Sequence, residues 1–239
     1  MPTDRNLPPT TATRASAYDV GLRTYFQRIY NNMAAGLAVT GAVAWLVAST
    51  PALMQFFFGN HIVAFIVVFS PLVVLMFGLT PGRMAAMTAG QMAGAFYLLS
   101  GLFGISFATI FFIYSGESIA RVFFITAATF AGTSIIGYTT KRDLTSMGSF
   151  MMMGFMGVFL ASLINMFMHS PALQFGISII GVVTITGLIA WNTQQFKEMY
   201  SSAAGRETND KLAIMAALSL YISFINLFQF LLNIMGNRR

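Results

Sequence analysis

Long apolar segments separated by short polar ones make up most of the chain. Residues 29–82 and 144–196 contain no charged residue, and each segment is interrupted once, at 51–60 in the first and at 169–171 in the second. A membrane-spanning helix needs about 20 apolar residues, so each segment is long enough for two spans. The predicted spans lie near residues 29–50, 61–79, 84–116, 122–140 and 212–237, with one more on each side of 169–171.

The segment at 84–116 is compatible with one long tilted helix or with two short helices that meet near Gly101 and Gly104. The positive-inside rule separates these alternatives, because cytoplasmic loops of membrane proteins are enriched in Lys and Arg. With seven spans, ten of the 13 Lys and Arg residues fall on the N-terminal side and three on the other. With eight spans the division is eight against five. The sequence therefore predicts seven spans with the N-terminus in the cytoplasm.

Composition agrees with an all-α integral membrane protein. The chain is 56% hydrophobic and 8% charged, whereas about a quarter of the residues of a soluble domain are charged. Its net charge of +6 is explained by the basic loops, so the expected environment is the lipid bilayer and no nucleic-acid partner is expected. The absence of Cys excludes disulfides and thiolate metal sites.

Two regions are expected, a flexible polar cytoplasmic tail at residues 1–28 and a seven-helix transmembrane domain at 29–236. No signal peptide is visible, and the first apolar segment is long enough to act as a signal anchor. The short tail and the absence of an organelle signal favour a bacterial inner membrane.

Polar residues in the last span form a stripe. Ser219, Ser223, Asn226, Gln229 and Asn233 are spaced four, three, three and four residues apart, which places them on one face of a helix. Because polar side chains are costly against lipid, this face is expected to meet other helices or a water-filled cavity. The last span is therefore expected to be central, with the stripe as the main candidate for a polar pathway.

Other polar or small residues lie within the spans. Asn165 lies near the end of the fifth span and Asn192 near the end of the sixth, where each can join helices by hydrogen bonds or line an ion pathway. Gly90 and Gly94 form a GxxxG pattern in the third span. This pattern allows close packing with another helix of the same chain or of a second copy.

No catalytic or metal site is expected. All seven carboxylates fall in predicted tails, loops or span ends, whereas a calcium site usually includes carboxylates and a proton relay needs a titratable group. The sequence has no Walker loop, HExxH, GxSxG or dinucleotide fingerprint, and no catalytic pair at membrane depth. The chain is therefore expected not to be an enzyme and to need no cofactor.

Five short motifs occur in order along the spans. They are YNNMAAGLAVT from Tyr30, GYTTKRDLT from Gly137, SLIN ending at Asn165, IAWNTQQ from Ile189 and ALSLYISFINLF from Ala217. Over residues 23–236 the chain resembles the Bax inhibitor-1 family, also called the transmembrane Bax inhibitor motif family. The resemblance implies six helices packed around a central C-terminal helix, which agrees with the polar stripe.

Bacterial members of this family include a pH-sensitive calcium leak, whose sensor is a pair of aspartates in patterns similar to YDxxQ and LYLDFINLF. The corresponding positions here are Asn192 and Ser223. A carboxylate pair can share a proton and respond to pH, whereas Asn and Ser can only hold a fixed hydrogen bond. We therefore expect a pH-insensitive polar contact between Asn192 and Ser223.

The resemblance leaves two functions open. One is a passive leak for calcium or another cation, with the stripe, Asn165 and Asn192 as pore candidates. The other is a non-conducting membrane regulator, because other bacterial relatives modulate a membrane quality-control protease and eukaryotic relatives are linked to stress and cell-death control. Residues 1–28 or 197–211 would then contact the partner. A secondary transporter is less favoured, because no coupling-ion ligand or pair of broken helices is evident.

Overall fold

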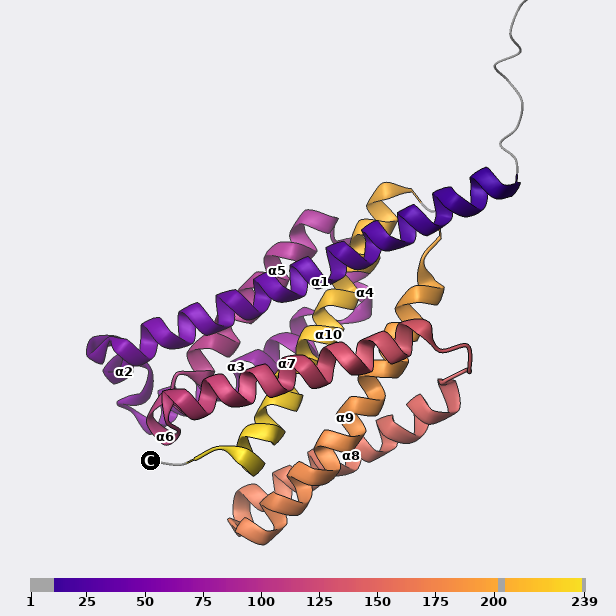
Figure 1. Cartoon of the computed structure of the whole chain (residues 1–239). Coiled ribbons are helices and arrows are strands. Elements are labelled where there is room, and N and C mark those ends of the chain that lie inside the picture. The colour runs from indigo at the N-terminus through magenta and orange to yellow at the C-terminus, as the bar shows by residue number, and fades with distance from the viewer. Residues whose placement is uncertain (1–10, 202–204, 238–239) are drawn as a thin grey trace, which may run out of the picture.

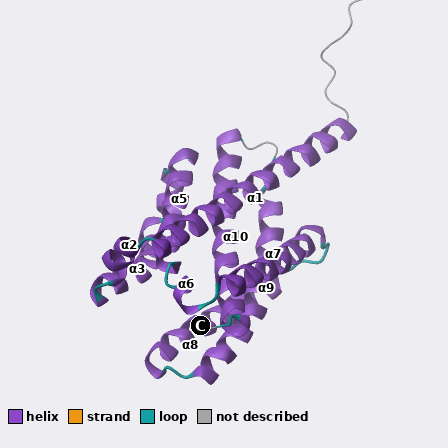
Figure 2. Cartoon of the chain, turned by 60° about the vertical axis from the view of Figure 1, so that its left-hand side comes forward, coloured by secondary structure: helices purple, strands orange, loops and turns teal. Residues whose placement is uncertain are grey.

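The structure is a computed structural model that describes residues 11–201 and 205–237. Within these residues every regular element is helical (Figures 1 and 2). In chain order the elements are α1 (Thr11–Ser49), α2 (Pro51–Phe58), α3 (His61–Val73), the π-helical turn η1 (Val74–Gly78), α4 (Pro81–Ala86), α5 (Ala89–Phe107), α6 (Ile110–Ile113), α7 (Gly116–Thr139), α8 (Thr145–Met168), α9 (Pro171–Met199) and α10 (Arg206–Met235).

Seven helical segments of the described chain are long and apolar enough to cross a membrane, which confirms the seven-span prediction. α3 and η1 together make the second span, and α5 and α6 make the third, over Ala89–Ile113. α5 continues through Gly101 and Gly104, so this region is one span rather than two short ones. The chain therefore starts and ends on opposite sides of the bundle, here called the N-terminal side and the C-terminal side.

α1 begins earlier than the sequence suggested. It starts at Thr11, so residues 11–28 are helical where a flexible tail was expected. Leu22, Tyr25 and Phe26 are buried in the core, because the apolar face of the first span continues at helical spacing toward the N-terminus. The first ten residues of the predicted tail lie outside the described residues.

α10 is the most buried span of the bundle. In its most apolar stretch 67% of the residues are buried, against 39% in α9 and 6% in the second span. It packs against α9, α1, α7 and α5 and runs through the middle of the bundle in Figure 1. Ala213, Ala216 and Ala217 are buried, and their small side chains allow neighbouring helices to approach. The central position expected for the last helix is confirmed.

α3 lies at the periphery and is held mainly by α5. Pro71 lies inside α3 and removes the backbone N–H that would otherwise bond the Val67 carbonyl. Two hydroxyls replace this donor, Ser70 Oγ of the same helix at 2.8 Å and Ser106 Oγ of α5 at 2.9 Å. A side chain of the neighbouring span therefore compensates the break that precedes η1.

Glycines mark close approaches between helices. A Cβ atom added at Gly137 of α7 would collide with the carbonyl oxygen of Ala190 on α9. One added at Gly104 of α5 would lie 2.8 Å from the carbonyl oxygen of Thr40 on α1. Since both obstacles are backbone atoms, these glycines set the distance between the paired helices.

Gly90 and Gly94 do not have this role within the chain. Both are exposed, and a Cβ atom added at either position would meet no other described helix within 4 Å. The structure therefore does not place the GxxxG pattern against another helix of the same chain. The inward face of α5 is formed instead by larger residues, Met92, Phe96 and Leu99, together with Ser100 and Gly104.

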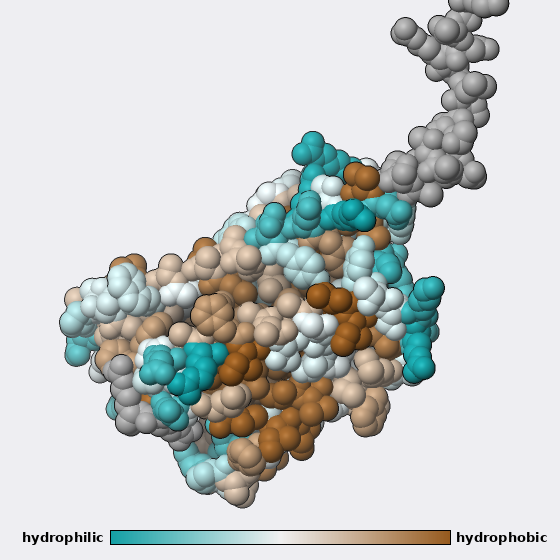
Figure 3. Space-filling model, viewed as in Figure 1, coloured by the Kyte–Doolittle hydropathy of each residue, from teal (hydrophilic) through white to brown (hydrophobic). Residues whose placement is uncertain are grey.

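Large apolar side chains remain exposed along the outer helices, where a membrane protein meets lipid. Figure 3 shows hydrophobic residues over the middle of the visible face and hydrophilic residues gathered toward its two ends. α8, which packs mainly on α9, exposes such residues along its length: Phe150, Met153, Met156, Leu160, Ile164 and Phe167.

Gly137→Ala is expected to destabilise the detergent-solubilised protein by about 1–3 kcal/mol, the usual cost of overpacking, because the new methyl group meets the backbone of α9. Gly132→Ala on the same helix is the matched control, since open space surrounds its added Cβ. Alanine also favours a helix over glycine by about 1 kcal/mol. Thermal unfolding of both variants checks the prediction, and equal melting temperatures would contradict the close α7–α9 approach.

Candidate functional site

The polar stripe lies on the least buried face of α10. Ser223 is 7% exposed, Ser219, Asn226 and Gln229 are half-buried, and Asn233 is exposed. The remaining faces of the helix carry residues buried against α1, α5, α7 and α9. The stripe therefore follows the one side of the central helix that keeps access to its surroundings.

Two stripe residues satisfy part of their hydrogen-bonding capacity within α10. Ser223 Oγ donates to the Ser219 carbonyl at 3.0 Å, and Asn226 Nδ2 donates to the Ile222 carbonyl at 2.8 Å. This back-bonding occupies donors and leaves oxygen atoms free to accept. Ser223 and Asn226 consequently keep neutral oxygen acceptors, and Asn233 Oδ1 farther along the stripe accepts from the Tyr114 hydroxyl at 3.3 Å.

At the C-terminal side the stripe reaches two adjoining cavities with volumes of about 500 and 600 Å³. Both are lined by Ser162 of α8, Gln174 of α9 and Asn233 of α10, and Gln229 lines the first. We call them the amide cavities, because Asn and Gln supply much of their polar lining. The other lining residues are Ile110, Ile113, Tyr114, Phe230 and Leu232 in the first, and Asn165, Met166, His169, Ser170, Pro171 and Phe175 in the second.

Asn165 holds the turn between α8 and α9. Its Nδ2 donates to Gln174 Oε1 at 3.0 Å, and its Oδ1 accepts from the Ser170 backbone N–H at 3.0 Å. His169 in this turn has a left-handed backbone, with φ of 51°. Asn165 thus lies at the amide cavities, where a residue of an ion pathway is expected. Its hydrogen bonds, however, stabilise the turn between α8 and α9.

Asn192 and Ser223 lie on α9 and α10, which pack against each other. The Asn192 side chain is half-buried, and the Ser223 hydroxyl donates to its own helix. Among the described residues no hydrogen bond joins the two side chains. The polar contact expected between them is therefore not formed in this structure.

Sequence reasoning missed a buried hydroxyl cluster that joins three helices. Thr40 of α1 and Tyr221 of α10 are hydrogen bonded at 2.7 Å. Thr40 Oγ1 also lies 2.9 Å from the Ser100 carbonyl oxygen of α5. All three residues are buried. Thr40 and Tyr221 both belong to the motifs quoted above, so polar positions inside those motifs were the available signal.

A second hydroxyl cluster lies nearer the N-terminal side. Tyr30 of α1 is hydrogen bonded to Ser134 of α7 at 2.5 Å, and Ser134 to Thr193 of α9 at 3.0 Å. Hydrogen bonds between spans stabilise a bundle in lipid, where apolar surfaces alone give little preference for one helix pair. The two clusters therefore fasten α1 to α10, α7 and α9.

Gln194 and Lys197 fasten the loop between α7 and α8 to the end of α9. Gln194 accepts from the Leu144 N–H and donates to the Arg142 carbonyl, each at 2.8 Å. Lys197 Nζ donates to the Tyr138 carbonyl at 2.8 Å. This carbonyl lies in the last turn of α7, where a cation complements the helix dipole. These contacts tie the end of α7 and the loop that follows it to α9 at the N-terminal side.

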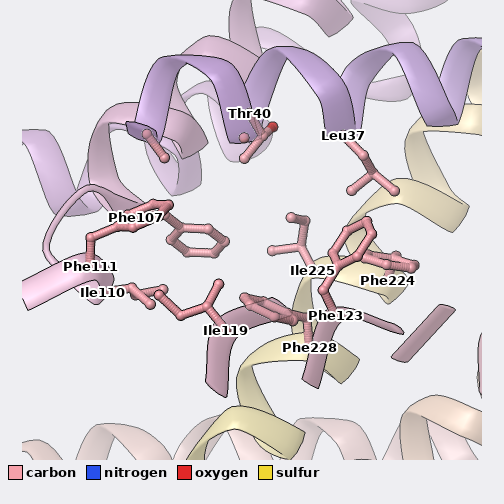
Figure 4. Close-up of a pocket in the computed structure, with 12 residues that line it drawn as sticks. Leu37, Thr40, Phe107, Ile110, Phe111, Ile119, Phe123, Phe224, Ile225 and Phe228 are labelled. Carbon is pink, nitrogen blue, oxygen red and sulfur yellow. The ribbon is translucent and has the colours of Figure 1, made fainter. Parts of the chain in front are cut away.

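A cavity of about 110 Å³ on the opposite face of α10 is apolar (Figure 4). Phe224, Ile225 and Phe228 line it from α10, facing residues of α1, α5, α6 and α7. The Thr40 hydroxyl at its edge is engaged in the cluster described above. The apolar lining of this cavity does not favour a hydrated path on this face of α10.

The described residues contain no group of three or more His, Cys, Asp or Glu that could hold a metal ion. Two carboxylates of α10 have partners at the N-terminal side. Asp210 forms an ion pair with Arg28, and Glu207 accepts from the Ala89 N–H at 2.9 Å, at the start of α5. A cation in the amide cavities would therefore meet neutral oxygen atoms.

Comparison with known proteins shows the family. A family model described as "Inhibitor of apoptosis-promoting Bax1" matches residues 22–239. The chain belongs to the Bax inhibitor-1 family. The resemblance seen in its motifs is thereby confirmed, and the chain is a multi-pass membrane protein of this family.

Bacterial relatives match over nearly their whole length. The chain is 44% identical over 231 residues to an uncharacterized protein of Rickettsia prowazekii, covering 96% of each. It is 42% identical over 231 residues to an uncharacterized protein of Caulobacter vibrioides, covering 92% of this chain and 91% of that one. It is 39% identical over 221 residues to the inner membrane protein YbhL of Escherichia coli, covering 92% and 94%.

Gln194→Leu is expected to destabilise the loop between α7 and α8 by about 1–3 kcal/mol, because two backbone groups lose their partner. Hydrogen exchange at Leu144 should accelerate. Gln195→Leu is the matched control, since the half-buried Gln195 takes no part in these two bonds. If exchange at Leu144 were the same in both variants, Gln194 would not hold the loop.

Proposed function

We propose that this Bax inhibitor-1 family protein is a passive cation leak whose pathway follows the stripe of α10. The observation that carries the proposal is that the amide cavities expose Gln229 and Asn233 at one end of the stripe. Asn226 and Ser223 continue the row of oxygen atoms toward the N-terminal side.

The expected permeant ion is Ca²⁺ or another cation that binds weakly. Amide and hydroxyl oxygens are hard ligands that suit Ca²⁺. The described residues that line the amide cavities include no carboxylate. Neutral ligands hold a cation less tightly than carboxylates, and conduction requires binding weak enough for the ion to leave.

The proposed membrane is a bacterial inner membrane, because the relative YbhL is named an inner membrane protein. We place the N-terminal side in the cytoplasm, since ten of the 13 basic residues belong to it. The amide cavities then face the periplasm. Conduction would require the loop held by Gln194 to separate from α9 at the cytoplasmic end.

Asn226→Leu is expected to slow calcium flux into proteoliposomes about tenfold, a barrier increase of roughly 1.4 kcal/mol, because an apolar side chain interrupts the row of oxygen atoms. Thr129→Val on α7 is the matched control. This half-buried hydroxyl bonds its own helix and lies outside the stripe. An entrapped calcium indicator reports the flux, and wild-type flux equal to that of protein-free liposomes would reject the leak.

Wild-type flux is expected to change little between about pH 5 and pH 8, because Asn192 and Ser223 do not titrate. The combination of Asn192→Asp and Ser223→Asp should introduce a pH dependence, since paired carboxylates share a proton that is lost as pH rises. Flux measured across this pH range compares the two proteins.

His169→Asn is the control in this experiment, because His169 lines the amide cavities. Asn tolerates the left-handed backbone with φ of 51° at this position. Wild-type flux that depends on pH, and still does so in His169→Asn, would contradict the pH-insensitive pathway.

A non-conducting regulator of a membrane quality-control protease or of a stress response is the second candidate. It is favoured by the bonds that tie Ser223, Asn226 and Asn165 to nearby groups, as expected of residues that only stabilise the bundle. α1 also extends past the other helices at the N-terminal side (Figure 1), where a partner can bind. Absent flux together with co-purification of a membrane protease would favour this candidate.

A further inference from the structure

A polar pocket of about 220 Å³ lies between α1 and α10 at the N-terminal side. None of its lining residues belongs to the stripe or to the amide cavities. We call it the arginine pocket. It is lined by Gly21, Thr24, Tyr25 and Arg28 of α1, by Tyr200, and by Arg206 and Asn209 of α10.

Tyr25 supplies an unused hydrogen-bond donor in this pocket. The residue is 3% exposed, and its hydroxyl has no hydrogen-bond partner among the described residues. Its ring is held by the ring of Tyr200, with centroids 5.3 Å apart, and by that of Phe26 at 5.7 Å. Buried hydroxyls are normally paired, so this fixed, unpaired hydroxyl indicates a ligand with an acceptor atom.

The charges of the pocket favour an anion. Arg28 forms an ion pair with Asp210, and Arg206 Nε lies 3.8 Å from the other oxygen of the same carboxylate. One carboxylate against two guanidinium groups leaves a net positive charge and several N–H donors unused. α10 begins at Arg206, so the positive end of its dipole adds to this field.

Tyrosine rings beside the pocket are typical of the level of phospholipid headgroups. Tyr18, Tyr25 and Tyr200 form a continuous ring cluster, with centroid distances of 5.3 Å from Tyr200 to each of the others. Tyr and Trp gather at the two membrane interfaces, where their rings sit at the level of the headgroups. Arginine pairs well with phosphate, because its N–H groups match phosphate oxygens in geometry.

We propose that the arginine pocket binds a phosphate group, with Arg28, Arg206 and the Tyr25 hydroxyl donating to its oxygen atoms. The phosphate belongs to an anionic phospholipid of the adjoining leaflet or to free inorganic phosphate. In either form it bridges α1 to the first turn of the central helix. This assignment is independent of the proposed leak.

Native mass spectrometry of the full chain in detergent tests the proposal, with phosphatidylglycerol, phosphatidylcholine and inorganic phosphate as separate probes. Phosphatidylglycerol should bind about tenfold more tightly than phosphatidylcholine, whose choline cation opposes the arginines. Stabilisation of the protein by inorganic phosphate alone would assign the site to the free anion. Binding of phosphatidylglycerol without an effect of inorganic phosphate would assign it to the lipid.

Variants show whether the pocket itself is responsible. Tyr25→Phe keeps the ring and removes the hydroxyl, and Arg206→Gln removes a largely exposed charge, so both variants should fold. The affinity of each variant for the phosphate-bearing probe should fall about tenfold. Arg23→Gln is the matched control, because this exposed arginine of α1 does not line the pocket. Unchanged affinity in Tyr25→Phe and Arg206→Gln would overturn the proposal, and so would an equal loss in Arg23→Gln.

Discussion

Burial of α10 on all faces but one is the constraint on which the rest of the bundle depends. In lipid the hydrophobic effect does not drive apolar helices together. Close packing and hydrogen bonds between the spans must therefore stabilise the bundle. The small alanine side chains of α10 allow the neighbouring helices to pack closely against it. Tyr221 of α10 is hydrogen bonded to Thr40 of α1. α1, α5, α7 and α9 all pack directly on α10, while α3 and α8 are attached through α5 and α9.

The central helix is chemically divided along its length. Toward α1 and α7 it contributes Phe224, Ile225 and Phe228 to an apolar cavity. The Tyr221 hydroxyl on this side is hydrogen bonded to Thr40. The opposite face carries Asn226 and Gln229, which are both half-buried, and Gln229 lines the first amide cavity. The polar side chains that reach the amide cavities from α10 are therefore neutral and lie on one face of the helix. A member of the family with carboxylates at positions 192 and 223 would add titratable charge beside the same face.

Much of the architecture could be predicted from local patterns. The lengths of the charge-free segments predicted the spans, and the distribution of Lys and Arg favoured seven spans over eight. The helical spacing of the polar stripe predicted that α10 is central. The sequence did not predict the contacts between helices, because these depend on which residues of two helices lie opposite each other. Gly90 and Gly94 have the packing pattern but face outward, whereas Gly137 has the packing role. The Thr40–Tyr221 bond joins residues 181 positions apart, and a single sequence does not give that register.

The order of the spans along the chain matters for biosynthesis, because α10 follows the six other spans. Chains grow from the N-terminus at about 5–20 residues per second. The sixth span is therefore synthesised some seconds before α10 is complete, and the earlier spans longer before that. Until then the inner faces of α1, α5, α7 and α9 lack the helix against which they pack. The Thr40 hydroxyl also lacks its partner Tyr221 until α10 is inserted. Loss of the span Arg206–Met235 would therefore remove the centre of the bundle rather than a peripheral helix, and the six remaining spans would lack the helix on which four of them pack.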